Sequence, residues 1–251
     1  MKEKVSIITA TFNSENEVLH TYYSLLEQTY GNWEWLVTDD CSTDSTLDIL
    51  SDIVAKDSRV SVFSNNTNYG AAVSRNKSLL SASGDFIAFV DSDDLWKNNK
   101  LELQVRFMQD NGVDFSFTAY ELIDEQGREK DVKVDGCQEG PVSYRDMLKK
   151  KATLGCSTVM LRRSKFNDLQ MPLLRTGQDY ATWLAILKGG HYAYCLNSVL
   201  TQYRIRSNSI SRNKFKKARR QWQIYRNVEN INFFSSIYYF CFYAYRAVFR
   251  R

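Results

Sequence analysis

Two acidic clusters in the N-terminal part of the chain carry the side chains best suited to chemistry. Residues 39–44 read Asp-Asp-Cys-Ser-Thr-Asp, and residues 91–94 read Asp-Ser-Asp-Asp. Closely spaced carboxylates repel one another, so the second cluster predicts a compensating cation. Mg²⁺ or Mn²⁺ prefers carboxylate oxygens together with phosphates. In an extended Asp-x-Asp segment alternate side chains point the same way, so Asp91 and Asp93 can reach one ligand.

Helix capping is the alternative use of these carboxylates. Asp44 and Asp94 each precede a stretch that we expect to be helical, where an aspartate can accept hydrogen bonds from free backbone N–H groups. Capping accounts for Asp44, but it does not explain Asp40, Asp91 and Asp93 together. We therefore interpret the two clusters as ligand-binding.

The elements that must position these clusters alternate along residues 1–100. Short apolar, β-branched stretches predict strands, and helical periodicity or capping residues between them predict helices. The expected strands cover residues 5–10, 33–38, 60–63 and 86–90, with helices from about 14 to 26, from 43, and from 71 to 80. This pattern predicts an α/β fold with a Rossmann-like, mostly parallel sheet and helices on both faces. Both acidic clusters then follow the carboxyl ends of strands, where such sheets bind ligands.

The alternation ends after residue 100. We expect strands at 115–120, 157–161 and 199–203, a helix at 180–187, and a polar, irregular stretch at 124–140. Residues 212–226 are rich in Lys and Arg, and residues 233–245 are mostly aromatic. The sequence therefore predicts one domain over residues 1–211, with halves at 1–100 and 101–211, and a basic, aromatic helical tail at 212–251.

Composition narrows the class of protein. The 251 residues are 43% hydrophobic and 25% charged, as in folded proteins, and the net charge of +4 is too small to indicate nucleic acid as a partner. The five cysteines are scattered without paired spacing, which argues against a disulfide framework or a zinc site and favours a reducing cytoplasm. Apolar runs are too short for an ordinary membrane span, so we expect no transmembrane helix.

Four motifs in a fixed order carry a family resemblance. They are Ser-Ile-Ile-Thr-Ala-Thr-Phe-Asn at 6–13, Val-Thr-Asp-Asp-Cys-Ser-Thr-Asp at 37–44, Asn-Tyr-Gly-Ala-Ala-Val-Ser-Arg-Asn at 68–76, and Phe-Val-Asp-Ser-Asp-Asp at 89–94. Together they resemble glycosyltransferase family 2, closely to residue 100 and more weakly to 211. The resemblance implies the GT-A fold, inversion at the transferred sugar, and nucleotide-sugar donors. Residues 1–100 would be the nucleotide-sugar-binding half and 101–211 the acceptor-side half of the catalytic domain.

The same resemblance implies roles for residues near the donor. Ala10 and Phe12 match positions that line a uracil pocket, and Asp40 matches the carboxylate that accepts from the base N3–H. Arg75 matches a basic residue beside the nucleotide. Core packing for Phe12 and a surface ion pair for Arg75 are the alternatives.

Roles for the metal and the diphosphate follow in the same way. Asp91 matches the residue near the ribose and the metal, and Asp93 matches the direct ligand of Mg²⁺ or Mn²⁺. The segment at 203–211 resembles the closing Tyr-Arg-x-His-x-x-Ser of the family, with Arg206 in place of His. Arg204 or Arg206 could therefore hold the diphosphate, since Arg is a good bidentate phosphate ligand. A solvated basic loop is the alternative.

Residues 176–184 are similar to the family's Glu-Asp motif before a helix. Asp179 falls on the catalytic-base position, while Gln178 departs from the usual Glu. The alternative is that Asp179 only caps the helix. On the family reading, Asp179 takes the proton of the acceptor hydroxyl.

The chain looks most like small bacterial enzymes that build O-antigen or capsule repeat units. This implies transfer of a hexose from a UDP-sugar to a lipid-linked, undecaprenyl-diphosphate saccharide at the cytoplasmic face of the membrane. A sugar nucleotidyltransferase would need a Gly-rich loop with Lys or Arg after the first strand, which residues 11–14 are not. A nucleotide-sugar-binding protein without transferase activity is disfavoured by Asp93 and Asp179.

The tail has three candidate uses. Its positive charges suit anionic lipid, and its Phe and Tyr side chains suit the headgroup boundary, so we expect a cytoplasmic protein peripheral on the inner face of the membrane. Apolar residues on all sides of the 233–245 helix also permit packing on the catalytic domain or a homodimer contact.

Overall fold

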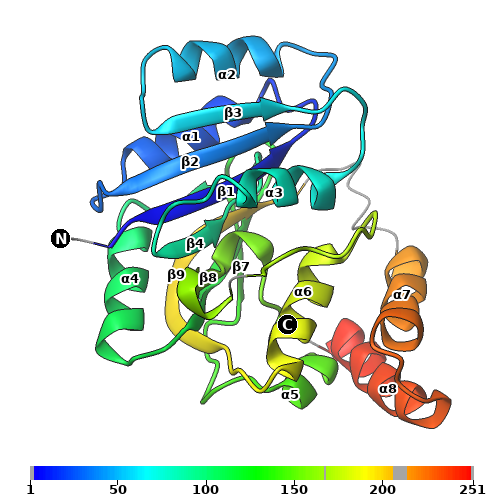
Figure 1. Cartoon of the computed structure of the whole chain (residues 1–251). Helices are drawn as coiled ribbons and strands as arrows, with labels where there is room; N and C mark the ends of the chain where they lie inside the picture. The colour runs from blue at the N-terminus through cyan, green and yellow to red at the C-terminus, as the bar shows by residue number, and fades with distance from the viewer. Residues whose placement is uncertain (1–2, 167, 206–213, 250–251) are drawn as a thin grey trace.

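The computed structural model describes residues 3–166, 168–205 and 214–249. Its first half is a parallel sheet in the order β3-β2-β1-β4, with a helix in each connection (Figure 1). The elements are β1 (Val5–Thr11), α1 (Val18–Leu26), β2 (Trp33–Asp39), α2 (Thr46–Val54), β3 (Val60–Ser64), α3 (Ala71–Leu79) and β4 (Phe86–Phe89). The predicted alternation of strands and helices is confirmed.

The sheet continues beyond β4 with mixed strand directions. β8 is antiparallel to both β4 and β6, β9 runs parallel to β6, β5 is antiparallel to β9, and β7 pairs with β6 outside this path. The bounds are β5 (Leu95–Trp96), β6 (Phe115–Ile123), β7 (Glu129–Val134), β8 (Met160–Arg162) and β9 (Tyr194–Arg204). The sheet is therefore parallel over β1 to β4 and mixed beyond β4, as expected.

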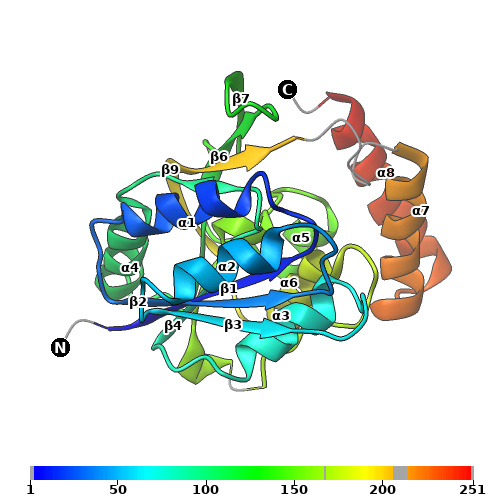
Figure 2. The same cartoon turned by 90° about the horizontal axis from the view of Figure 1, so that it is seen from above.

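Helices cover both faces of the sheet because alternate strand residues point to opposite sides. Ile7 packs into the cluster with α1, α2 and α4 (Lys100–Asp110), whereas its neighbour Ile8 packs into the cluster with α3, α5 (Tyr144–Leu148) and α6 (Gln178–Lys188). Figure 2 shows α1 and α2 on one side of the parallel strands and α3 on the other. Both faces of the strands are apolar, which explains the continuous hydrophobic runs in the sequence.

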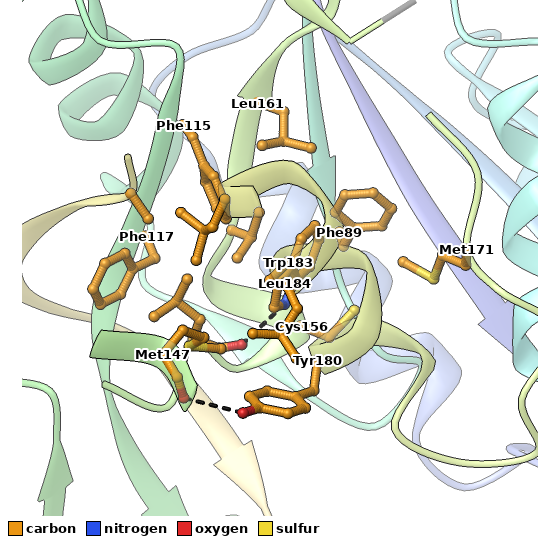
Figure 3. Close-up of a cluster of buried hydrophobic side chains, with 14 of the residues drawn as sticks. Phe89, Phe115, Phe117, Met147, Cys156, Leu161, Met171, Tyr180, Trp183 and Leu184 are labelled. Atoms are coloured by element: carbon orange, nitrogen blue, oxygen red, sulfur yellow. Dashed lines mark hydrogen bonds between the residues drawn. The ribbon is translucent and has the colours of Figure 1, made fainter. Parts of the chain in front are cut away.

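The packing of α6 fixes the position of Asp179, which lies in the first turn of this helix. Trp183 is fully buried and lies against the rings of Phe89 and Phe115 at centroid distances of 5.5 and 5.6 Å. Its indole N–H donates to the Leu154 carbonyl at 3.2 Å, and the Tyr180 hydroxyl donates to the Met147 carbonyl at 3.0 Å (Figure 3). These contacts hold the first turn of α6 in a defined orientation.

Three local expectations are wrong. Residues 95–96 form a strand paired with β9 rather than the start of a helix, and α4 begins only at Lys100. Part of the stretch expected to be irregular forms β7, which is largely exposed and lacks an apolar signal. Residues 157–158 belong to a 3-10 turn (η1, Cys156–Thr158) before β8. For β5 and β7, pairing with a distant strand overrides a weak local pattern.

The tail forms α7 (Lys214–Gln223), a π-helical turn (Ile224–Val228) and α8 (Phe233–Phe249), which lie beside α6 and α5 (Figure 1). Ile224 and Tyr225 are buried in the same core cluster as α6. The Tyr225 hydroxyl donates to the Leu148 carbonyl at 2.6 Å, and Lys188 forms an ion pair of 3.1 Å with Glu229. The described part of the tail therefore packs on the catalytic domain. Residues 206–213, which include the predicted domain boundary, lie outside the described residues.

Among the described residues no helix is both long and apolar enough to cross a membrane.

Candidate active site

The carboxyl ends of β1 and β2 form one side of the site. Thr11 and Asp39 are partners in the ladder, so the loops that follow both strands lie together. Asn13 donates its backbone N–H to Ser42 Oγ at 2.9 Å and accepts from the Thr43 N–H at 2.9 Å. The two loops are thus tied into one surface.

Ala10 and Phe12 lie at this edge. Ala10 is half-buried, and the Phe12 side chain is 46% exposed. Core packing, the alternative for Phe12, is wrong, because a core ring would be shielded. An exposed ring at the carboxyl end of a parallel strand can stack on a planar ligand. The uracil contact remains a prediction.

Asp40 organises the neighbouring loop. Its side chain is nearly buried and accepts from the Gly70 N–H at 2.7 Å, the Tyr69 N–H at 3.0 Å and Asn65 Nδ2 at 2.9 Å. Gly70 has a φ of 95°, a conformation that glycine adopts readily, and is the N-cap of α3. A carboxylate has about four lone-pair sites, so Asp40 keeps capacity for one further N–H. It holds the start of α3 whether or not it reads a base.

Arg75 links α3 to the acidic cluster at the end of β4. Its guanidinium lies 2.5 Å from Asp91 Oδ1 and the residue is only 5% exposed, so the surface ion pair considered above is wrong. Burial would lower the pKa of Arg75, but the acidic groups of Cys156, Asp91 and Asp179 raise it above its usual value. Arg75 therefore lies within the electrostatic reach of both Asp91 and Asp179.

Arg204 donates hydrogen bonds to two residues of the acidic cluster at 91–94. Its backbone N–H donates to Asp94 Oδ1 at 2.9 Å, and its Nε donates to the Asp93 carbonyl at 2.8 Å. A further guanidinium nitrogen donates to the carbonyls of Asp124 and Glu125 at 3.2 and 2.9 Å. These contacts favour a positioning role for Arg204, and its predicted diphosphate contact stays a prediction. Arg206 lies outside the described residues.

Asp94 has a structural role distinct from that of its neighbours. It is fully buried and accepts from Ser157 Oγ at 2.5 Å as well as from Arg204. It does not cap a helix, since a strand follows it. Asp44, by contrast, accepts from the N–H of Thr46, the first residue of α2, at 3.1 Å. The N-cap residue itself is Ser45, so Asp44 satisfies a free N–H at the start of the helix from one position earlier.

Asp91 and Asp93 present the donor atoms that a divalent cation would use. Both are half-buried rather than enclosed, and Arg75 engages one oxygen of Asp91. Within the described ranges no group of three or more His, Cys, Asp or Glu side chains is arranged to hold a metal. Mg²⁺ is commonly bound through one or two carboxylates and completed by substrate phosphates. The residues present fit a metal of that kind, held jointly with a diphosphate.

Asp179 lies in the first turn of α6 and is half-buried. The N-cap of this helix is Gly177, with a φ of 76°, and no side chain makes a cap hydrogen bond. The interpretation of Asp179 as a helix cap is therefore wrong. Its carboxylate instead lines a cavity of about 340 Å³ between α6 and the tail.

Four cationic side chains line the same cavity, and none was assigned to the site from the sequence. They are Lys150, Lys217, Arg220 and Arg246. The basic stretch at 212–226 was interpreted from the sequence as a lipid-binding surface, with packing of the tail on the catalytic domain left open, because nothing in it predicts contact with α6 in particular. Its place beside Asp179 depends on how the tail packs.

An acidic edge on a parallel sheet, linked through Arg75 to a second carboxylate on α6, suits an enzyme that acts on a phosphorylated ligand. The chain belongs to glycosyl transferase family 2, whose sequence profile matches residues 6–169. It has the GT-A fold, and the resemblance read from the four motifs is confirmed. Asp179 and the tail lie beyond the matched range.

Two relatives match nearly the whole chain. A Bacillus subtilis protein named as a teichuronic acid biosynthesis glycosyltransferase, TuaG, is 43% identical over 250 residues, covering 100% of this chain and 98% of its own. The Escherichia coli UDP-Glc:α-D-GlcNAc-diphosphoundecaprenol β-1,3-glucosyltransferase WfgD is 39% identical over 88% of this chain and 84% of its own. The tail is therefore part of the similarity with TuaG.

Solved structures agree with this assignment. Staphylococcus aureus TarS 1–349 in complex with UDP-GlcNAc is 25% identical, with a TM-score of 0.71 over 89% of this chain and 67% of that chain. The Pyrobaculum calidifontis mannosyltransferase PcManGT, with GDP-Man and Mn²⁺, is 18% identical, with a TM-score of 0.70 over 92% of this chain and 66% of that chain. The second likeness shows the fold alone.

Proposed function

We propose that the protein is an inverting glycosyltransferase that moves a hexose from a UDP-sugar to an undecaprenyl-diphosphate-linked saccharide in bacterial surface polysaccharide synthesis. The observation that carries the proposal is the position of Arg75, which is paired with Asp91 and within electrostatic reach of Asp179. Arg75 would therefore lie between the donor-binding edge of the sheet and the candidate base Asp179. The printed activity of WfgD supports the choice of donor and acceptor.

At the donor edge, Phe12 would stack on uracil and Asp40 would accept from its N3–H. Asp91 and Asp93 would hold Mg²⁺ or Mn²⁺ together with the UDP diphosphate. When bound, this cation neutralises charge on the leaving diphosphate. Arg75 keeps Asp91 in place through their ion pair.

At the acceptor side, Asp179 would remove the proton of the attacking sugar hydroxyl. The hydroxyl oxygen forms a bond to the anomeric carbon while the bond from that carbon to the UDP oxygen breaks, and the electron pair leaves with UDP. Attack opposite the leaving group inverts the anomeric configuration. The proton ends on the Asp179 carboxylate, so atoms and charges balance.

The outer face of the tail supports a peripheral membrane position on the inner face of the cell membrane. Phe215 and Phe234 are 89% and 82% exposed, and Tyr245 is also exposed, although the other side of the tail is buried on the domain. Aromatic side chains beside basic ones favour the headgroup region of anionic bilayers. A homodimer through the same face is the competing use.

Liposome flotation of the full chain tests the membrane position. We expect the wild type to float with anionic vesicles, and a Phe215→Ser, Phe234→Ser double variant to float much less. Phe12→Ser, which removes an exposed aromatic ring on the nucleotide edge, is the matched control. Light scattering of the same samples detects dimers, and equal flotation of all three proteins would contradict the membrane position.

The activity itself is tested with a panel of UDP-sugars and a synthetic lipid-diphosphate GlcNAc acceptor. We expect one UDP-sugar to yield a disaccharide product whose new linkage, by NMR, has the anomeric configuration opposite to that of the donor. Retained configuration, or release of UDP without sugar transfer, would contradict the proposal.

A further inference from the structure

The cavity beside Asp179, hereafter the tail cavity, is built by segments far apart in the chain. Asp179 and Tyr180 come from α6, Lys217 and Arg220 from α7, and Arg246 from α8. Lys150 completes the cationic lining from the turn after α5. Among the described residues that line it, Asp179 is the only acid, so the cavity carries excess positive charge.

Arg220 is the cavity cation with a buried, unused hydrogen-bond donor. Its Nε is buried and has no hydrogen-bond partner, which is costly for a charged group unless a ligand accepts from it. Burial lowers the pKa of Arg220, while the charge of Asp179 acts in the opposite direction. Arg220 therefore lies near Asp179 and keeps a donor unused.

The other three cations line the same cavity as Arg220. Burial, and after it the charge of Arg220, lowers the pKa of Lys217. Arg246 donates to the Lys151 carbonyl at 3.3 Å, and Lys150 Nζ lies 3.2 Å from the centroid of the Tyr180 ring. Two like charges on α7 that disfavour each other are stabilised when an anion lies between them.

Asp179 is close enough to interact electrostatically with a cation of the donor edge and with a cation of the tail cavity. Arg75, with its partner Asp91, acts on Asp179 from the sheet, and Arg220 acts on it from the tail. A ligand that places a hydroxyl at Asp179 and an anionic group among the cations of the tail cavity would use both kinds of lining residue. A saccharide joined to a diphosphate carries both groups.

We propose that the tail cavity is an anion subsite that binds the diphosphate group of the acceptor, with Arg220 and Lys217 as its principal ligands. This inference rests on the proposed function and extends it to the residues that recognise the acceptor. Arg offers several N–H donors in a planar fork that matches phosphate oxygens. No metal is needed here, because the protein supplies the positive charge.

The test compares two acceptors that carry the same sugar, one on an alkyl diphosphate and one on a neutral alkyl glycoside. In Arg220→Gln and, separately, Lys217→Gln, we expect KM for the diphosphate acceptor to rise roughly tenfold or more, since charged hydrogen bonds are lost. KM for the neutral acceptor and the affinity for UDP should not change. Arg219→Gln is the matched control and should behave as wild type, because Arg219 is exposed on α7 as Lys217 is, but does not line the cavity.

Each other outcome overturns the inference. A matching loss of UDP affinity would assign the cations to the donor diphosphate, and an equal rise in KM for both acceptors would indicate a structural role. An effect seen only with anionic vesicles present would assign them to lipid headgroups. Wild-type KM values that are equal for the two acceptors overturn the inference alone, whereas absence of transfer to either acceptor overturns the proposed function as well.

Discussion

The donor edge of the sheet and the tail cavity, which both influence Asp179 electrostatically, differ in charge and in the segments that build them. The donor edge is acidic, with Asp91 and Asp93 shortly after β4. Its buried cations Arg75 and Arg204 already have partners, the Asp91 carboxylate and the Asp93 carbonyl. The tail cavity is basic, and Asp179 is its only described acid. An acidic edge can hold a diphosphate only through a metal, whereas a basic cavity can hold one directly. On the proposed function, one enzyme would recognise two diphosphates by different chemistry and so keep donor and acceptor apart.

Replacement of Asp93 by Ala would break the donor side of this comparison. We expect it to abolish metal-dependent UDP binding, because Asp93 is the proposed direct metal ligand. Calorimetric titration of UDP in the presence of Mn²⁺ measures the effect. Asp110→Ala, which removes an exposed carboxylate from α4, is the control. Wild-type affinity in Asp93→Ala would contradict the metal assignment.

Asp179→Asn tests the centre between the two sides. The N-cap of α6 is Gly177, so the variant should fold normally. Transfer should fall about a hundredfold or more, the usual scale for a lost general base, with donor affinity retained. Single-turnover rates and UDP-sugar affinity on the same protein are the decisive pair. A near-normal rate would remove Asp179 from the mechanism.

Removal of the metal should distinguish UDP binding at the donor edge from acceptor binding in the tail cavity without any mutation. We expect EDTA to reduce UDP affinity by roughly tenfold or more, while binding of the alkyl-diphosphate acceptor stays constant, because only the donor edge would use a cation. Both affinities can be measured by calorimetry on the wild type, and added Mn²⁺ should restore the first. Parallel loss of both affinities would show that the two diphosphates share one metal.

The smallest expected effect comes from Gly177→Ala. Its φ of 76° disfavours a side chain, and an added Cβ would lie 2.8 Å from Arg220 Cδ. We expect the free energy of unfolding to fall by about 1 kcal/mol and Arg220 to shift, with a several-fold higher KM for the diphosphate acceptor only. Gly112→Ala has a similar positive φ in open space and controls for backbone strain. If both variants change that KM alike, the contact with Arg220 has no bearing on the acceptor.

Local sequence was sufficient where the chain makes its structure from neighbouring residues. The strands β1, β2 and β4 were predicted because both of their faces are apolar, and the acidic clusters follow them directly. The same local reasoning placed Asp179 at the start of a helix. It did not find β5 or β7, because their partners lie far along the chain.

Only the tertiary structure decided what the polar side chains contact. The sequence left open whether Arg75 forms a surface ion pair or lies beside the nucleotide. In the folded chain it is the buried partner of Asp91. Arg204 was a candidate phosphate ligand, and packing made it a donor to backbone carbonyls, that of Asp93 among them. By sequence, the basic tail was a candidate for contact with lipid, with the catalytic domain or with a second copy, and its packing placed Arg220 in the same cavity as Asp179. The physical reason is range: the hydrophobic pattern of a strand or helix is written in adjacent residues, whereas the partner of a charge is set by which distant segments pack together.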